Sequence, residues 1–428
     1  MIKKCLRVAI ALIVMATMVA ACSTDDNNVE NGGSEPQPVV STVEPPTSLE
    51  LTHAELEMVN SSNEFAFNLF RTAQDEVKSQ VLSPLSITFA LGMLNNGAAG
   101  ETLQQINKVL GFSDTGADGI NDFCYKMLQR APNLDPLTKV LIANTIYMNK
   151  PYELMPDFVQ KANTFYNAEP ETRNFYDGKT RDVINKWGAD HTEQMIKEVL
   201  KEEEFDPTSV SYLLNAIYFK GTWAKKFDKA ETVNEPFNHA GDGKDLFTPP
   251  MMHQRAKFDY TETDAYQALR LPYGNGSFAM TVLLPKTDSR AVPQVPTAEM
   301  WEQLNQRMHS TQVDVKLPRF ESDTDINLRP IMIELGMPDA FDLERADFSR
   351  FCVWSVERIY IYLMKQVAKI KLDEEGTEAA AVTVIDMKDG CDPSADVYQT
   401  FHANHPFLYI ISEQKTGAIF FIGQFTGR

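Results

Sequence analysis

One stretch decides the fold: Lys371-Leu-Asp-Glu-Glu-Gly-Thr-Glu-Ala-Ala-Ala-Val-Thr-Val-Ile385, continued by Asp386-Met-Lys-Asp-Gly-Cys-Asp-Pro393. It starts with the residues of a strand, passes into a run of small side chains, and ends in a polar segment with Gly and Pro that is typical of an exposed loop. A buried strand favours bulkier side chains, and a flexible linker favours Gly and Ser. We therefore expect Gly376-Thr-Glu-Ala-Ala-Ala381 to leave one conformation and adopt another.

The composition limits the possible classes of protein. With 428 residues, of which 43% are hydrophobic, the chain can bury a large core, and its length alone suggests two or three domains. The formal net charge is -19, whereas a nucleic-acid-binding protein should carry a basic surface. We therefore expect no nucleic-acid partner, and we interpret the acidity as a solubility feature of an exported protein.

The first residues have the pattern of an export signal. Lys3, Lys4 and Arg7 form a positive region, and the apolar run from Val8 to Val19 that follows is too short to span a bilayer. Val19-Ala-Ala-Cys22 resembles the lipobox of bacterial lipoproteins, which implies that Cys22 is lipidated and becomes the mature N-terminus. Several acyl chains would anchor the protein stably in a membrane. Secretion without an anchor is the alternative.

The residues after Cys22 are predicted to form a tether. Residues 23–50 are rich in Asn, Gly, Ser, Pro, Glu and Val without a helical or strand period, which indicates disorder. Ser23-Thr-Asp-Asp-Asn-Asn28 resembles the acidic tract that sorts some lipoproteins to the cell surface. The predicted organisation is a signal peptide at 1–21, an acylated Cys and linker at 22–50, and a folded region at 51–428. We expect a lipid anchor in the outer membrane and exposure at the cell surface, with a secreted or periplasmic location as the alternative.

The cysteines do not form the pattern of a disulfide framework. After removal of the signal and acylation of Cys22, the remaining residues are Cys124, Cys352 and Cys391. Three is an odd number, so at most one disulfide can form and one thiol stays free. The sequence has no CxxC pair and no zinc-ligand spacing, and we therefore expect no structural metal and no cofactor.

Two long apolar runs predict the centre of a covered sheet. Val140–Met148 and Val210–Phe219 are apolar on both alternating faces. Within them Asn144 and Asn215 need hydrogen-bond partners, and we expect each to satisfy a local irregularity of the backbone. Ser83-Pro-Leu-Ser86 predicts the start of a helix, with Ser83 as the N-cap and Pro in the first helical position.

Short motifs from Leu51 to Arg428 recur in the order and at the spacing of one known family. They are Ser83-Pro-Leu-Ser86, Asn96-Gly-Ala-Ala-Gly-Glu-Thr102, Ile184-Asn-Lys-Trp187 with Thr192, Asn215-Ala-Ile-Tyr-Phe-Lys-Gly-Thr-Trp223, Leu317-Pro-Arg-Phe320, Leu335-Gly336, Ala346-Asp-Phe-Ser349, Gly376-Thr-Glu-Ala379 and His405-Pro-Phe407. On these motifs the chain resembles a serpin. The resemblance implies an α+β fold in one domain, with three β-sheets, about nine helices and an exposed reactive-centre loop, in a monomeric protein.

The resemblance also implies a function and a partner. Most serpins are suicide-substrate inhibitors of serine-type endopeptidases, and cysteine endopeptidases form a further target class. The target protease cleaves the exposed loop, forms a covalent acyl complex, and is trapped when the loop inserts into the main β-sheet, which is a form of strand addition. The alternative is a non-inhibitory binding or carrier protein with the serpin fold at the cell surface.

The composition of the expected hinge permits insertion. A segment that becomes a central strand sends alternate side chains to opposite faces of the sheet. The inward positions would be Thr377, Ala379, Ala381, Thr383 and Ile385. The first of these are small, and Glu378 falls on the outward face, where a charge costs little. No Pro occurs from Gly376 to Cys391, so each amide there can join a ladder. The predicted hinge comprises Glu375, Gly376, Thr377, Glu378, Ala379, Ala380 and Ala381.

The position of the scissile bond has two solutions. The commonest family spacing, counted from Gly376, gives Gly390-Cys391 as the reactive bond. Counting back from His405-Pro-Phe407 places it several residues later. Met387 and Lys388 are the chemical alternatives, because Met suits an elastase-like pocket and Lys suits a trypsin-like pocket.

A second group of residues is expected where the sheet opens. Ser83, Ser86, Asn215 and Gln366 are predicted to form a polar cluster that holds the strands closed, and Trp223 is predicted at the top of the same sheet. Many animal serpins have a His at the position of Gln366, so this chain lacks that pH-sensitive group.

A surface hydrolase is the third class of function, and the sequence argues against it. It contains no GxSxG, no HExxH and no paired-carboxylate motif, and its 7 His residues suggest no catalytic triad. His402 and His405 are three apart, but we expect them to be structural rather than metal ligands. We therefore predict that the protein is not an enzyme.

Overall fold

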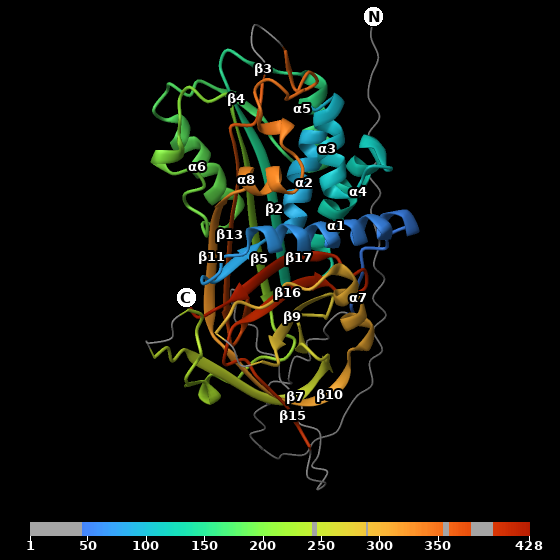
Figure 1. Ribbon diagram of the computed structural model, residues 1–428, viewed down its shortest axis with the longest axis vertical. Helices are drawn as coiled ribbons and strands as arrows, with labels where there is room; N and C mark the ends of the chain where they lie inside the picture. Colours follow the sequence, from blue (N-terminus) through green and yellow to red (C-terminus); the bar gives the residue numbers. More distant parts are fainter. Residues whose placement is uncertain (1–44, 242–245, 288–289, 354–358, 378–396) are drawn as a thin grey trace, which may run out of the picture. The chain divides into compact units, whose positions relative to one another are not determined.

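The computed structural model describes residues 45–241, 246–287, 290–353, 359–377 and 397–428 (Figure 1). These residues form eight α-helices. They are α1 (His53–Ala73), α2 (Pro84–Asn95), α3 (Gly100–Leu110), α4 (Gly116–Arg130), α5 (Pro156–Tyr166), α6 (Thr180–His191), α7 (Ala298–Arg307) and α8 (Arg329–Glu334). None of these helices is both long and apolar enough to cross a membrane.

The strands of the described residues form three sheets. The first has nine strands in the order β1 (Gln80–Leu82), β17 (Ile419–Phe425), β16 (Phe407–Glu413), β9 (Phe278–Pro285), β8 (Tyr266–Pro272), β7 (Pro250–Glu262), β10 (His309–Pro318) and β15 (Gln399–His402), with β6 (Val233–Asn234) paired to β7. The second runs β11 (Phe320–Asn327), β13 (Leu363–Asp373), β14 (Gly376–Thr377), β5 (Ser211–Thr222), β2 (Thr138–Asn149) and β4 (Glu171–Arg173). The third pairs β12 (Cys352–Val353) with β3 (Glu153–Leu154). The predicted α+β class with three sheets is confirmed.

Residues Val43–Arg428 form one compact unit, so the division into two or three domains suggested by length does not apply to them. Packing starts slightly before the predicted boundary at residue 51. Leu49 is fully buried, and the Thr47 hydroxyl donates a hydrogen bond of 2.7 Å to the Leu134 carbonyl. The predicted signal peptide, Cys22 and most of the predicted linker lie outside the described residues, so the lipid anchor stays a prediction.

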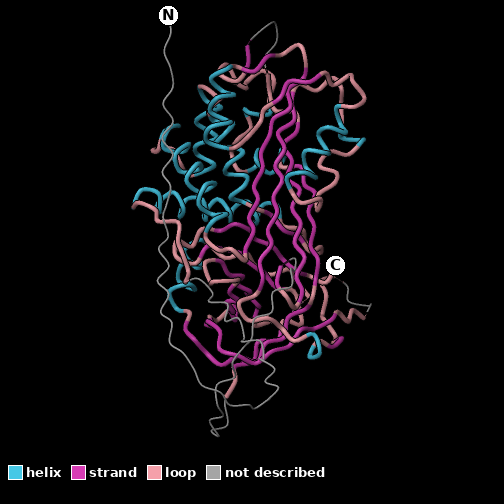
Figure 2. The backbone as a smooth tube through the Cα atoms, turned by 180° about the vertical axis from the view of Figure 1, so that it is seen from behind, coloured by secondary structure: helices cyan, strands magenta, loops and turns pink. Residues whose placement is uncertain are grey.

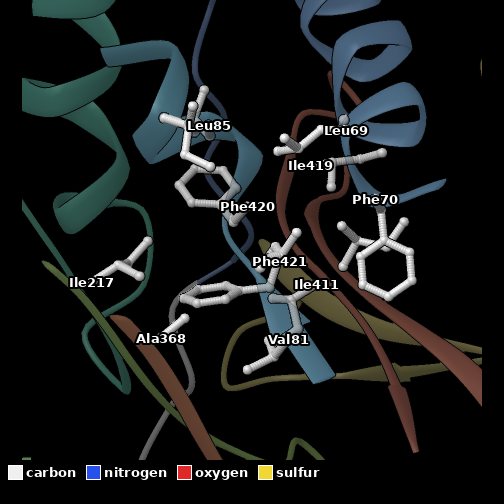
Figure 3. Close-up of a cluster of buried hydrophobic side chains, with 14 of the residues drawn as sticks. Leu69, Phe70, Val81, Leu85, Ile217, Ala368, Ile411, Ile419, Phe420 and Phe421 are labelled. Carbon is white, nitrogen blue, oxygen red and sulfur yellow. The ribbon is translucent and has the colours of Figure 1, made fainter. Parts of the chain in front are cut away.

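The main core lies where α1 and α2 meet the two large sheets. All twelve residues of α2 are buried, and its start follows the predicted pattern, with the Ser83 side chain accepting a hydrogen bond from the Ser86 amide. Figure 3 shows Phe421 of β17 pointing toward Ile217 of β5 and Ala368 of β13. This core therefore joins the nine-stranded sheet to the centre of the six-stranded sheet.

A second, smaller core covers the opposite face of the six-stranded sheet. The long strands of that sheet run side by side in Figure 2, and α6 contacts β2 and β5. Buried side chains of this core include Ile184 and Val199 on the helix side and Tyr212, Leu214 and Leu363 on the sheet side. The central strands are therefore covered on both faces, which explains why apolar residues of β2 and β5 occur on both alternating faces.

The described cysteines are buried thiols. Cys124 lies in α4 and Cys352 in β12, and they do not form a disulfide with each other. Burial raises the pKa of both thiols, that of Cys352 to about 11. Both side chains therefore stay protonated at neutral pH. Cys391 lies outside the described residues.

Candidate functional site at the seam of the six-stranded sheet

The central feature of the six-stranded sheet is the boundary between β5 and β13, which we call the seam. The two strands pair in parallel over six residues, from Leu363 opposite Tyr212 to Ala368 opposite Ile217. Farther along, the short strand β14 lies between them and pairs antiparallel with both. The seam is therefore closed at one end and already occupied at the other.

The strand in the seam is the start of the predicted hinge. Thr377 lies opposite Leu372 of β13 and opposite Gly221 of β5, and its side chain is fully buried. The Tyr273 hydroxyl lies 2.6 Å from the Thr377 hydroxyl oxygen. Burial raises the pKa of Tyr273 well above its usual range, so its hydroxyl keeps its proton. The first inward position of the hinge is thus seated in the sheet of the uncleaved chain.

Glycine is required beside Thr377. Gly376 has φ +150°, and a Cβ built on it would lie 2.0 Å from the Gly221 carbonyl oxygen. Any larger residue would push β14 away from β5, because backbone atoms cannot give way as a flexible side chain can. A Cβ on Gly221 would in turn lie 2.7 Å from the Tyr273 ring. Two glycines therefore let the hinge approach β5 closely.

Trp223 holds the turn that leads into β14. Its indole stacks on Tyr273 with 4.5 Å between ring centroids and 9° between planes. Its ring N–H donates a hydrogen bond of 2.9 Å to the Asp373 carbonyl, and its backbone N–H donates one of 2.8 Å to the Glu375 carbonyl. Trp223 thus binds both ends of the turn between β13 and the hinge.

Each of the two glutamates of this turn forms an ion pair with a basic side chain. Glu374 is 1% exposed, contacts the Arg319 guanidinium and accepts a hydrogen bond of 2.7 Å from the Thr232 hydroxyl. Burial acts against ionisation of Glu374, but the hydrogen bonds from Arg319 and Thr232 outweigh it and lower its pKa. Glu375 lies 2.7 Å from Lys226 and 3.0 Å from Lys229, which also lower its pKa. The start of the hinge is therefore fixed by charge as well as by packing.

A buried polar cluster closes the seam beyond the hinge. The Gln366 side-chain nitrogen lies 3.0 Å from the Ser83 carbonyl, 3.0 Å from the Ser86 hydroxyl and 2.7 Å from the Asn215 side-chain oxygen, and these three acceptors share its two N–H groups. Its oxygen accepts from the Ser83 backbone N–H at 3.0 Å. Asn215 in turn donates to the Asn144 side-chain oxygen at 2.7 Å. These bonds connect β13 to β5, β2 and the start of α2.

The prediction that Asn144 and Asn215 each satisfy a local irregularity of the backbone is wrong. Asn144 and Asn215 lie opposite each other in regular antiparallel pairing, so neither compensates for an irregular backbone. They bond to each other and, through Asn215, to Gln366. A single sequence does not show which residues face each other across two strands, and this pairing was therefore missed.

The structure brings together four of the residues predicted for the opening region: Ser83, Ser86, Asn215 and Gln366. Trp223 lies apart from them, next to the hinge. Of the hinge, Glu375, Gly376 and Thr377 are described. The residues outside the described ranges are Glu378, Ala379, Ala380, Ala381, Met387, Lys388, Gly390 and Cys391. Sequence reasoning missed Tyr273, Gly221, Arg319 and Glu374 as residues that hold the hinge and the turn before it, because a motif does not show which distant residues it contacts.

His402 and His405 point to different partners. His402 Nε2 lies 3.4 Å from Asp314, whereas His405 Nε2 lies 2.9 Å from the Pro285 carbonyl. Within the described ranges no group of three or more His, Cys, Asp or Glu side chains could hold a metal ion. The two histidines therefore have structural contacts.

Comparison with known proteins gives one consistent family. The family model described as Serpin (serine protease inhibitor) matches residues 60–427. Serpin B6 of Macaca fascicularis is 33% identical over 380 residues, which cover 86% of this chain and 99% of the relative. The leukocyte elastase inhibitor of Equus caballus is 32% identical over 87% of this chain and 100% of the relative. The native state of the thermophilic serpin tengpin superposes with a TM-score of 0.80 at 28% identity, over 90% of this chain and 97% of that structure.

The ion pair of Glu374 predicts a pH-dependent stability. Glu374→Gln should lower the free energy of unfolding at pH 7 by about 2 kcal/mol, because a charge-assisted hydrogen bond is lost. The folded pKa of Glu374 is lowered, so its contribution is present above the unfolded pKa of about 4.3 and is lost as the pH falls through the folded pKa. Urea unfolding of both proteins at pH 7 and pH 3 measures the difference. A difference of the same size at both pH values would contradict this assignment.

The polar cluster predicts a second effect on stability. Gln366→Met keeps the length of the side chain but leaves the Ser83 amide without its acceptor, and it should lower the free energy of unfolding by about 2 kcal/mol. Gln303→Met, at an exposed position of α7, is the matched control and should change it by less than about 0.5 kcal/mol. If the two variants unfold at the same urea concentration, the cluster does not hold the seam closed.

Proposed function

Because the chain belongs to the serpin family, we propose that it inhibits serine-type endopeptidases, with cysteine endopeptidases as a further target class, by conformational trapping. Serpins are mostly protease inhibitors rather than enzymes, and they act on target proteases. In the proposed mechanism the cleaved loop inserts into the seam between β5 and β13. The observation that carries the proposal is the position of Gly376 and Thr377, which are already paired with both strands.

Strand pairing supplies a driving force for this mechanism. In the uncleaved chain β5 and β13 share a parallel ladder of six residue pairs. Each residue added to β14 opposite residues 363–368 of β13 would replace one parallel pairing by antiparallel pairings on two sides. Antiparallel ladders are slightly more stable for each residue, and the inserted strand also gains hydrogen bonds for its own backbone groups. The inserted form should therefore be the more stable one.

The polar cluster should oppose the entry of a strand into the closed part of the seam. The pairing of Gln366 with Asn215 lies in the closed part of the seam. A strand that advances must separate these two side chains, which leaves buried amides without partners until new contacts form. Cleavage releases one end of the loop, and the gain in pairing can then offset this cost. The cluster thus acts as a barrier between the seated and the inserted hinge.

The proposal predicts a covalent complex and a rise in stability. Incubation with elastase, trypsin, subtilisin and papain should yield, for at least one of them, a complex that survives denaturing electrophoresis. Cleavage of the loop by a protease that is not trapped should raise the thermal midpoint by more than 10 °C, since the loop is then free to insert; this threshold corresponds to roughly 3 kcal/mol or more for a domain of this size. If every protease stays active and the cleaved protein melts at the original temperature, the proposed function is wrong.

A pair of variants one residue apart tests insertion directly. By alternation from Thr377, position 379 faces inward after insertion and position 380 faces outward. Ala379→Arg should abolish the covalent complex and turn the protein into a substrate, because an inward guanidinium would lose its hydration. Ala380→Arg adds the same charge and size on the outward face and should keep more than half of the inhibition. Equal loss in both variants would mean that they disturb recognition by the protease rather than insertion.

A further inference from the structure

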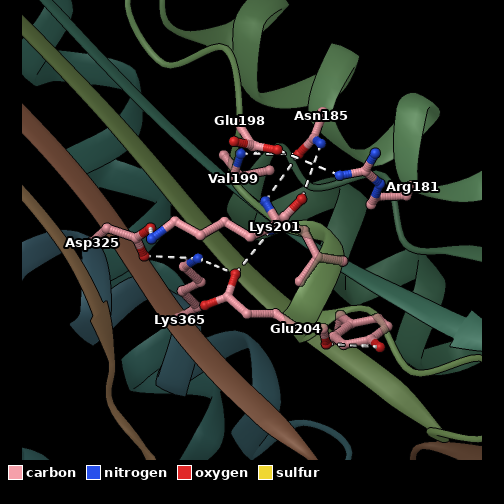
Figure 4. A network of polar contacts seen from close by, with 10 residues as sticks. Arg181, Asn185, Glu198, Val199, Lys201, Glu204, Asp325 and Lys365 are labelled. Atoms are coloured by element: carbon pink, nitrogen blue, oxygen red, sulfur yellow. Dashed lines mark hydrogen bonds and ion pairs between the residues drawn. The ribbon is translucent and has the colours of Figure 1, made fainter.

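A structural unit lies across the seam on the face opposite to α2. It consists of α6 and the segment 192–206 that returns from α6 toward β5, and we call it the seam cover (Figure 4). Its residues Ile184 and Val199 pack in one apolar cluster with side chains from both sides of the seam. Leu214 belongs to β5, whereas Leu363 belongs to β13. A strand that widens the seam must therefore disturb this packing.

The seam cover is internally tied. The Asn185 side-chain oxygen of α6 accepts hydrogen bonds from the Val199 amide at 3.0 Å and the Leu200 amide at 2.9 Å, and its nitrogen donates to the Leu200 carbonyl at 3.0 Å. Gly188 allows this close approach, since a Cβ there would lie 2.5 Å from the Val199 side chain. The helix and its return segment should therefore move as one body.

Four charged side chains connect the seam cover to the far side of the seam. Lys365 of β13 is 1% exposed and lies 2.5 Å from Glu204 and 2.7 Å from Asp325 of β11. Asp325 also lies 2.8 Å from Lys201. The Lys201 backbone N–H donates to Glu204 at 2.9 Å, which completes a ring (Figure 4). Two positive and two negative charges balance within the ring, so the buried ammonium of Lys365 is compensated.

Two of these ion pairs cross the seam. Lys201 and Glu204 belong to the cover, which leads into β5, whereas Asp325 and Lys365 lie on the paired strands β11 and β13. Neighbouring strands lie about 4.8 Å apart, so an inserted strand moves β13 away from β5 by about that distance. Contacts of 2.5 Å and 2.8 Å do not survive such a displacement. The Asp325–Lys365 pair lies on one side of the seam and is not affected.

We propose that Lys201, Glu204, Asp325 and Lys365 form a latch that holds the cover closed over the seam, and that opening this latch is a step that limits the rate of strand insertion. The latch proposal depends on the proposed function in one respect: it assumes that the cleaved loop inserts at the seam. A merely structural ion-pair cluster would stabilise the uncleaved and the inserted protein equally. The latch stabilises the uncleaved protein alone, and this difference can be measured.

The test uses a variant that removes only the crossing contacts. The double variant Lys201→Met and Glu204→Gln removes both ion pairs that cross the seam. Lys365 keeps its ion pair with Asp325, so no buried charge is left without a partner. The matched control is Glu321→Gln, which removes an ion pair of 2.7 Å to Lys369 between β11 and β13 on one side of the seam. Both changes are made in the full chain.

The readouts are the rate at which a synthetic peptide of sequence 377–385 binds into the sheet and the thermal midpoints before and after loop cleavage. We expect the double variant to take up the peptide about three to ten times faster, as loss of two partly buried ion pairs allows. Its uncleaved form should melt at a lower temperature and its cleaved form at the wild-type temperature. The control should take up the peptide at the wild-type rate.

Other outcomes overturn the latch. An unchanged rate in the double variant, an equal fall of both midpoints, or an equal acceleration in the control would each reject it. Failure of the peptide to bind to any of the proteins would reject the seam as the place of insertion, and the latch with it. A wild-type midpoint that does not rise after cleavage would contradict the proposed inhibitor function, and the peptide rates would still decide the latch.

Discussion

The structure depends on a parallel seam that polar groups close from both faces. Gln366 points toward α2 and bonds to Asn215, and its neighbour Lys365 points to the other face and pairs with Glu204. Apolar side chains alone would tolerate small sliding movements of the two strands. Buried polar groups are satisfied in one arrangement only, and they cost free energy in any partly opened state. The part of the seam around Lys365 and Gln366 is therefore held in one closed arrangement.

In the proposed mechanism, the seated hinge also sets the register of the inserted strand. In a β-strand a shift of one residue moves every side chain to the opposite face. Thr377 is fixed against Gly221 and Leu372, and the turn before it is held by Trp223 and by the ion pair of Glu374. Residues that follow Thr377 in sequence would continue this register. The small side chains of the hinge would therefore face inward only because the pairing of Gly376 and Thr377 fixes where the strand starts.

Several parts of this arrangement could be predicted from sequence because their signals are local. The cap at Ser83, the apolar strands around Asn144 and Asn215, and the small residues of the hinge each follow from a short pattern. The seating of Gly376 and Thr377 could not be predicted, because it depends on Gly221 and Tyr273 from distant segments. The role of Lys365 was missed for the same reason. A lysine in a strand normally indicates a solvated face, and here its partners come from the segment after α6 and from β11.

The stacking of Trp223 on Tyr273 has a practical consequence for following the molecule in solution. The indole is almost fully buried, contacts the hinge turn through two hydrogen bonds, and lies against the ring whose hydroxyl contacts Thr377. The emission of a tryptophan depends on the polarity and the hydrogen bonds around its ring. Withdrawal of the hinge would expose this chromophore to water, whereas further insertion would leave its surroundings intact. The sequence has 4 Trp residues, so the fluorescence of a variant that keeps Trp223 as its one tryptophan would distinguish the two directions in which the loop can move.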